Sequence, residues 1–345
     1  MQEKNYRYLV SVRCFTYNHS DYILDALNGF VIQQTDFPYV ILLVDDASID
    51  GESEVISNYL NANFNVCDDS ISYQKETEYA NIIYAQHKTN KNCFMVAMLL
   101  KYNHFQLGRN RDKLKYLAEW RDKCKYEALC EGDDYWIDSL KLQKQVNFLE
   151  CNSEYTMCFH NAIERVDNKL ANITFSGIKD KEYTGVMLFK KWLVPTASVV
   201  LRLDVLESDI YSRVLKSNKF IYGDTPMFCS CAELGKVRGF SDIMSVYRRH
   251  DGGMTANKFD LLDFRFYTHQ EEFYHVFGKK YKSPFYISNY YAYVIIKLIT
   301  QRQFSDIIKV VRTNPYPVYI PINILMFPFT YLISKIKGRF KKCLK

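Results

Sequence analysis

The chain has 345 residues, of which 48% are hydrophobic and 16% aromatic, so it can bury a large core and is not expected to be disordered. Its formal net charge is +6, but six basic residues fall within positions 335–345, and the rest of the chain is close to neutral. A net charge of this size does not by itself argue for nucleic acid, and we expect none as a partner.

The ten cysteines include no C-x-x-C pair, and the start of the chain has no apolar signal core. Neither a zinc ribbon nor secretion is therefore indicated. Four cysteines lie among apolar neighbours and are predicted to be small core residues in a reducing compartment: Cys14, Cys130, Cys158 and Cys229.

The first sixty residues alternate between strand and helix patterns. Residues 9–15 and 39–44 are apolar enough for strands, whereas apolar residues recur with a period near 3.6 over 22–31 and 55–60. Ser20 is placed to cap the first helix. The alternation predicts an α/β domain with a parallel sheet.

The pattern is less regular farther along the chain. Apolar, β-branched runs predict further strands at 81–86, 94–100, 128–130, 155–166 and 197–203. Periodic apolar residues predict helices at 114–121, at 140–149, from about Asp224, and through most of 259–312.

The last segment combines an apolar stretch with a basic end. Residues 313–334 contain no charged side chain, but four prolines would interrupt a regular membrane-spanning helix. Because the basic cluster at 335–345 follows directly, we predict attachment to an anionic membrane surface. A buried C-terminal helix with a solvated basic end is the alternative.

Two acidic clusters follow predicted parallel strands, namely Asp45-Asp46 and Glu131-Gly132-Asp133-Asp134. Ligands of open α/β sheets bind at the carboxyl ends of the strands, so both clusters could face one crevice. Carboxylate oxygens suit Mg²⁺ or Mn²⁺, which would bridge a diphosphate. The alternative is that these acids are ordinary turn residues that cap helices.

Three sequence blocks, at 9–18, 44–51 and 130–136, resemble in order and spacing the signatures of family 2 glycosyltransferases with the GT-A fold. The resemblance covers roughly residues 6–255. It implies an α/β, Rossmann-like nucleotide-diphospho-sugar transferase domain at 1–255. A mainly helical extension at 256–312 and the membrane-associating tail at 313–345 would follow.

The resemblance also implies roles for individual residues in binding the donor. The turn at Thr16, Tyr17 and Asn18 would pass beside the nucleotide base. Asp45 or Asp46 would contact the base or ribose. Glu131 stands where the family has aspartate and would contact ribose or metal, and Asp133 would bind the metal.

Two later segments complete this expected site. Asp224, at the start of a predicted helix, occupies the place of the family's general base, although Gly223 stands where an acid usually precedes it. The segment from Tyr247 resembles the family's Tyr-Arg-x-His loop. His250 would complete the metal shell or touch the diphosphate, and Arg248 or Arg249 would offset the diphosphate charge.

The expected protein is therefore a metal-dependent, inverting, hexosyltransferase-like enzyme that uses Mn²⁺ or Mg²⁺. Its donor would be a nucleotide sugar, with a UDP-sugar favoured, and its acceptor a glycan or a lipid-linked glycan of surface polysaccharide. We expect it in the cytoplasm, peripheral to the inner face of the membrane.

Two other functions are alternatives to this one. A sugar-phosphate nucleotidyltransferase would need a glycine-rich loop after the first strand, and residues 16–20 contain no glycine. A membrane-tethered glycan-binding or scaffold protein would explain the aromatic content and the tail, but not three ordered acidic motifs.

Overall fold

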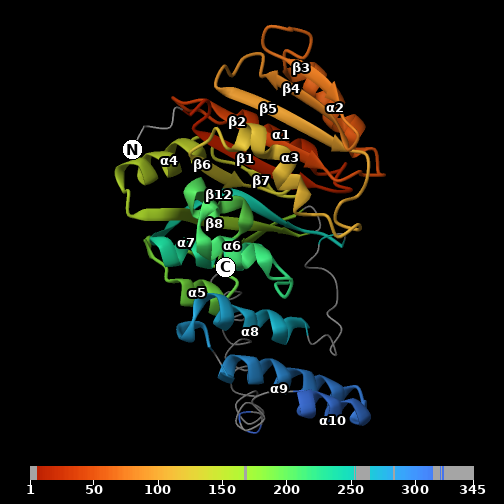
Figure 1. Cartoon of the computed structure of the whole chain (residues 1–345), viewed down its shortest axis with the longest axis vertical. Coiled ribbons are helices and arrows are strands. Elements are labelled where there is room, and N and C mark those ends of the chain that lie inside the picture. The colour runs from red at the N-terminus through yellow and green to blue at the C-terminus, as the bar shows by residue number, and fades with distance from the viewer. Residues whose placement is uncertain are drawn as a thin grey trace. The chain divides into compact units, whose positions relative to one another are not determined.

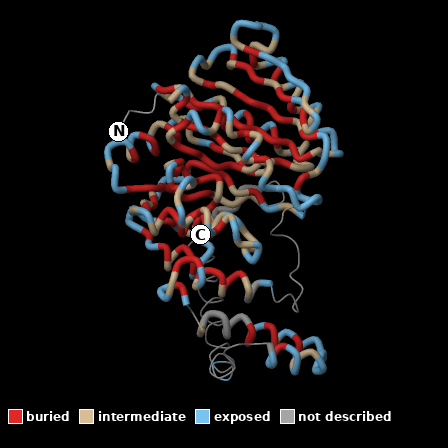
Figure 2. Tube along the Cα trace, in the orientation of Figure 1, coloured by how far each residue is buried: buried red, intermediate tan, exposed pale blue. Residues whose placement is uncertain are grey.

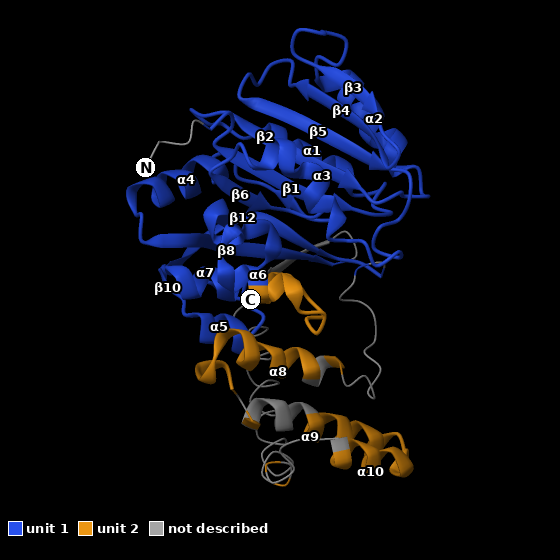
Figure 3. Ribbon diagram, viewed as in Figure 1, with its two compact units in different colours: residues 1–212, 227–256 blue, residues 213–226, 257–345 orange. Residues whose placement is uncertain are grey.

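The computed structural model describes residues 6–166, 169–251, 253, 265–282, 284–313, 319 and 321. Most of the predicted tail at 313–345 thus lies outside the described residues, as does Gly252. The chain divides into two compact units, 1–212 with 227–256 and 213–226 with 257–345 (Figure 3).

The first unit is built on a mixed sheet whose centre is parallel (Figure 1). Four parallel strands lie in the order β6 (Tyr126–Leu129), β1 (Val10–Thr16), β2 (Tyr39–Asp45) and β5 (Cys93–Leu100). The predicted α/β fold with a parallel sheet is confirmed.

Further strands extend this centre on both sides, and all their pairings are antiparallel except the parallel pair β8–β12. Beyond β5 lie β4 (Ala80–Gln86) and β3 (Tyr73–Glu76). Beyond β6 lie β11 (Val200–Arg202), β8 (Tyr155–Val166), β12 (Lys236–Arg249) and β10 (Lys181–Glu182). The strands β7 (Tyr135–Trp136) and β9 (Lys169–Thr174) pair with β12 and β8 respectively.

The core lies on both faces of the parallel strands, whose buried stretches are red in Figure 2. Every residue of β2 is buried. Alternate β2 side chains enter separate apolar clusters, Tyr39, Ile41 and Leu43 in one and Val40, Leu42 and Val44 in the other. Because strand side chains alternate between faces, the continuous apolar run in β2 is what a strand covered on both sides requires.

Seven helices accompany these strands between residues 6 and 251. They are α1 (Ile23–Val31), α2 (Glu52–Asn63), α3 (Asp112–Arg121), α4 (Lys141–Cys151), α5 (Gly185–Lys190), α6 (Asp209–Lys216) and α7 (Asp224–Leu234). A Cβ added to Gly29 would lie 2.8 Å from the backbone nitrogen of Trp136. Helix α1 therefore packs directly against the backbone of β7.

Some local predictions were wrong. Helix α1 begins at Ile23 with Tyr22 as its N-cap, and the backbone N–H of Ser20 instead donates to Asp50. The strand expected at 197–203 is a short 3₁₀ turn, Thr196–Ser198, followed by β11.

The four cysteines predicted to lie in the core are all buried.

The second unit contains α8 (Arg265–Phe277), a 3₁₀ turn (Lys279–Tyr281), α9 (Pro284–Thr300) and α10 (Phe304–Thr313). The prediction of a mainly helical segment at 259–312 is confirmed where the structure describes it. None of the helices in the described ranges has both the length and the apolarity that crossing a membrane would need.

Candidate functional site

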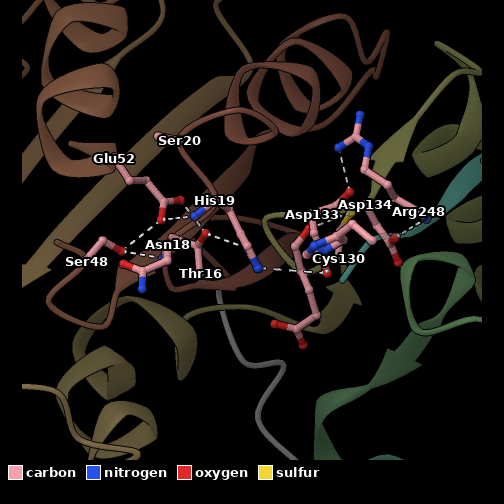
Figure 4. A network of polar contacts seen from close by, with 12 residues as sticks. Thr16, Asn18, His19, Ser20, Ser48, Glu52, Cys130, Asp133, Asp134 and Arg248 are labelled. Carbon is pink, nitrogen blue, oxygen red and sulfur yellow. Dashed lines mark hydrogen bonds and ion pairs between the residues drawn. The ribbon is translucent and has the colours of Figure 1, made fainter. Parts of the chain in front are cut away.

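The first and third sequence blocks meet at the carboxyl ends of the parallel strands. The turn after β6 lies against the end of β1, where the Gly132 N–H donates to the Phe15 carbonyl at 3.1 Å. A Cβ on Gly132 would lie 2.1 Å from Thr16 Oγ1 and 3.2 Å from His19 Nδ1. Only glycine fits so close an approach, and this approach places the Asp133 turn beside the turn after β1 (Figure 4).

Three side chains here form a group that could hold a metal ion, His19, Asp133 and His250. Their ligand atoms all lie within 4.8 Å of one another. His250 Nε2 is 3.1 Å and His19 Nε2 is 3.9 Å from Asp133 Oδ2. Burial alone would raise the pKa of Asp133, but the hydrogen bond with His250 and the nearby imidazoles hold it below its ordinary value.

The structure thus brings together two of the three predicted metal ligands. Glu131, the third, is half-buried and does not belong to this group. His19 was not predicted as a ligand. Its position directly after the Thr16-Tyr17-Asn18 turn was the available signal.

His19 is held by a buried polar relay that begins at Glu52 on α2 (Figure 4). The Thr16 hydroxyl donates to the Glu52 carboxylate, and Thr16 Oγ1 is 3.1 Å from His19 Nδ1. The other Glu52 oxygen accepts from the His19 N–H at 2.9 Å and from the Ser48 hydroxyl at 2.8 Å. Burial raises the pKa of Glu52 and lowers that of His19.

The two acids that follow β2 are both buried and engaged by the protein. Asp45 accepts from the Ser48 N–H at 3.1 Å and from the Ser53 hydroxyl. Asp46 pairs with Lys113 Nζ at 2.6 Å and accepts from the backbone N–H of His104 at 2.7 Å. Their carboxylates therefore organise the loops at 46–53 and 102–113, and sequence reasoning missed Lys113.

The turn after β1 is tied to the turn after β2. Asn18 has a positive φ of 55°, its N–H donates to Ser48 Oγ at 2.9 Å, and its Oδ1 accepts from the Ile49 N–H at 3.0 Å. Asparagine tolerates this backbone conformation better than most residues. Tyr17 is half-buried next to it.

Arg248, at the end of β12, is almost fully buried and holds the metal turn in place. Its N–H donates to Asp134 Oδ1 at 2.8 Å, and its guanidinium donates to the Asp133 carbonyl at 2.7 Å and to Asp25 on α1 at 2.5 Å. The guanidinium also lies 4.7 Å from the ring centre of Tyr22. Burial and then the Asp133 charge raise the pKa of Asp134 well above its ordinary value.

The remaining predicted residues lie as follows. Arg249 is exposed and pairs with Glu164 at 3.1 Å. Asp224 is half-buried as the first residue of α7, in the segment 213–226 of the second unit.

No family model matches the chain. The uncharacterized protein Rv1520 of Mycobacterium tuberculosis is 28% identical over 254 residues, which cover 71% of this chain but only 60% of that protein. The uncharacterized glycosyltransferase MG025 of Mycoplasma genitalium is 31% identical over 137 residues, 39% of this chain and 35% of that protein.

Solved structures that resemble this chain include residues 1–349 of S. aureus TarS. Its complex with UDP-GlcNAc matches with a TM-score of 0.54 at 15% identity, over 82% of this chain and 71% of that chain. Its complex with UDP matches with a TM-score of 0.51 at 16% identity, over 82% and 70%.

Proposed function

We propose that this chain, which has the GT-A fold of glycosyltransferases, moves a sugar from a nucleotide-sugar donor to a glycan or lipid-linked acceptor. The observation that carries the proposal is the position of Asp133. It lies at the carboxyl ends of the parallel strands, where ligands of such sheets bind, with two histidines against its carboxylate. The reaction that we propose inverts the anomeric configuration.

The donor would lie along the turns that follow the parallel strands. We propose that Thr16, Tyr17 and Asn18 line the base, that Asp45 and Asp46 shape the base and ribose pocket, and that Glu131 contacts ribose. A UDP-sugar is the donor that we favour, because TarS was solved with UDP-GlcNAc and with UDP.

Negative charge develops on the diphosphate of the donor as it leaves, and a nearby positive charge stabilises it. Asp133 and His250 fit a divalent ion, since their ligand atoms are 3.1 Å apart and one is a carboxylate oxygen. A bound Mn²⁺ or Mg²⁺ would supply Lewis-acid stabilisation of the leaving diphosphate. The exposed Arg249 side chain can add a further positive charge.

We propose Asp224 as the general base. Its carboxylate would take the proton from the acceptor hydroxyl as that oxygen attacks the anomeric carbon. One carboxylate in this role suffices for a direct displacement, which forms no covalent intermediate with the enzyme.

The test separates binding from chemistry. D133N should abolish metal-dependent binding of UDP, because it removes the charged ligand. D224N should keep UDP binding but lower transfer by about 10²–10⁴-fold, the usual contribution of a general base. D242N is the control, since Asp242 is exposed on β12. Absence of metal-dependent binding of any nucleotide to the folded protein would instead favour a glycan-binding scaffold.

A second part of the proposal concerns the membrane. Helix α10 exposes Phe304, Ile308 and Val311, which lie along one face, together with Lys309 and Arg312. Apolar and basic side chains on one helix suit an anionic lipid surface. We propose that this helix and the apolar-basic tail bring the enzyme to the inner face of the cytoplasmic membrane, where surface polysaccharide is assembled on lipid carriers.

A further inference from the structure

The hydrogen bonds around His19 fix which of its ring nitrogens carries a proton. The single hydroxyl proton of Thr16 is donated to Glu52, so Thr16 Oγ1 can only accept from His19 Nδ1–H at 3.1 Å. A neutral imidazole has one N–H, so Nε2 presents a lone pair. That lone pair lies 3.9 Å from a carboxylate oxygen of Asp133.

Two electron-pair donors that face each other at this distance favour a cation between them. His250 Nε2 lies 3.1 Å from the same Asp133 oxygen, so a third ligand atom is already at hand. Two ligands bonded to one ion at about 2.1 Å each can lie up to about 4.2 Å apart. The distances of 3.1 Å and 3.9 Å fall within that span.

We propose that His19 is the third protein ligand of the divalent ion, and that the resulting set of two imidazoles and one carboxylate selects transition-metal ions over Mg²⁺. The use of this ion in sugar transfer rests on the proposed function, but its binding does not. Mg²⁺ is bound mainly through oxygen ligands and retains several waters, whereas imidazole nitrogen suits Fe, Ni, Cu and Zn, and the affinity of such a site rises along the first transition series from Mn²⁺.

The surroundings of His19 support this role. Histidine ligands of metals usually donate their other ring nitrogen to a partner that fixes tautomer and orientation, and the Thr16–Glu52 pair supplies such a partner. A Cβ added to Gly132 would lie 3.2 Å from His19 Nδ1, so the turn that presents Asp133 runs directly beside this imidazole.

The experiment titrates Mn²⁺ alone into the full chain by calorimetry, and then challenges bound Mn²⁺ with a large excess of Mg²⁺ by electron paramagnetic resonance. The variants are H19Q, which removes the ligand, and T16V, which keeps the shape but removes the relay. H275Q is the control, because His275 is exposed on α8. Circular dichroism checks that each variant folds.

The wild type and H275Q should bind Mn²⁺ equally and resist displacement by Mg²⁺. H19Q should bind about 100-fold and T16V about tenfold more weakly, the range seen when groups around a metal are removed. The nitrogen couplings of bound Mn²⁺ should fall from two imidazoles to one in H19Q.

Each alternative outcome has a definite meaning. Wild-type affinity in H19Q, or ready displacement of Mn²⁺ by Mg²⁺, overturns the inference but leaves sugar transfer to be judged on donor turnover. Metal binding that needs His19, without turnover of any nucleotide sugar, upholds the inference and counts against the proposed function.

Discussion

At the scale of single residues, the contacts of Arg248 point to a role in positioning the metal turn. The Tyr-Arg-x-His resemblance made it a candidate for offsetting diphosphate charge. Its guanidinium instead donates to the Asp133 carbonyl and to Asp25, and it is nearly enclosed. These contacts support a positioning role, in which Arg248 joins helix α1 to the turn that presents Asp133.

Lysine carries its three N–H donors on one nitrogen in place of a planar fork, so it does not match the two acceptors that separate guanidinium nitrogens reach here. R248K should therefore lower kcat for donor turnover by about 100-fold, the cost of a small misplacement of catalytic groups, and should change the donor KM much less. Turnover and Mn²⁺ affinity measure the effect, with R213K on the exposed face of α6 as control. Unchanged kcat in a folded R248K would contradict the positioning role.

Some site residues could be predicted from sequence and others could not. Asp133 and His250 stand in recognisable blocks of neighbouring residues. Glu52 and Lys113 act through partners 36 and 67 residues away, and no local pattern specifies which distant polar groups will meet. Such pairings depend on the register of the parallel strands.

At the scale of elements, helix α4 contains a lysine in an apolar position, next to Trp136. Lys141 is fully buried, with its ammonium 4.1 Å from the ring centre of Trp136 and with no hydrogen-bond partner for Nζ among the described residues. Burial lowers the pKa of Lys141 to about 7.

This lysine should make stability depend on pH. Between about pH 7 and pH 10 the unfolded chain, with an ordinary lysine pKa, holds more protons than the folded one, so raising the pH stabilises the fold. K141M lacks this dependence. Relative to K141M, the wild type should gain up to about 1.4 kcal/mol in free energy of unfolding per pH unit over this window.

Urea denaturation at several pH values measures that difference. K190M, which replaces an exposed lysine on α5, should keep the wild-type dependence. A constant difference between wild type and K141M across the window would show that Lys141 titrates normally.

Predictability also varied between elements. Strand β2 was easy to predict because its residues are apolar up to the final Asp45. All seven of them are buried in the structure. The fourteen-residue strand β12 was not predicted. Its middle is polar and exposed, and its pairing with β8 contains several register shifts, so the strand has no continuous alternation.

At the scale of the whole molecule, two features suited to a membrane lie late in the sequence. They are the basic cluster at 335–345 and the exposed apolar face of α10. I308E should weaken binding to anionic vesicles by about tenfold or more, because burying an isoleucine in the lipid boundary is worth about 1.5–3 kcal/mol and about 1.4 kcal/mol is a factor of ten. Vesicle co-sedimentation measures this, with I243E on β12 as control. Equal binding by I308E and wild type would leave α10 without a role at the membrane.

The fold class was predictable because the α/β alternation and the order of the three blocks agreed. The division into two units was not predictable from the sequence. Residues 213–226 belong to the second unit, although the segments on both sides of them, 1–212 and 227–256, belong to the first. No change in composition marks either position, and the assignment depends on tertiary packing.

The three proposed ligands come from distant parts of the sequence, Asp133 and His250 being 117 residues apart. An ion that binds them all closes long loops of chain and is lost when the protein unfolds, so it adds to the folding free energy by an amount that grows with the logarithm of its affinity. The loaded protein should then resist proteolysis better than the stripped one, with no sugar present. Cells starved of that ion would then lose part of the polypeptide to degradation, in addition to the activity that the ion supports directly.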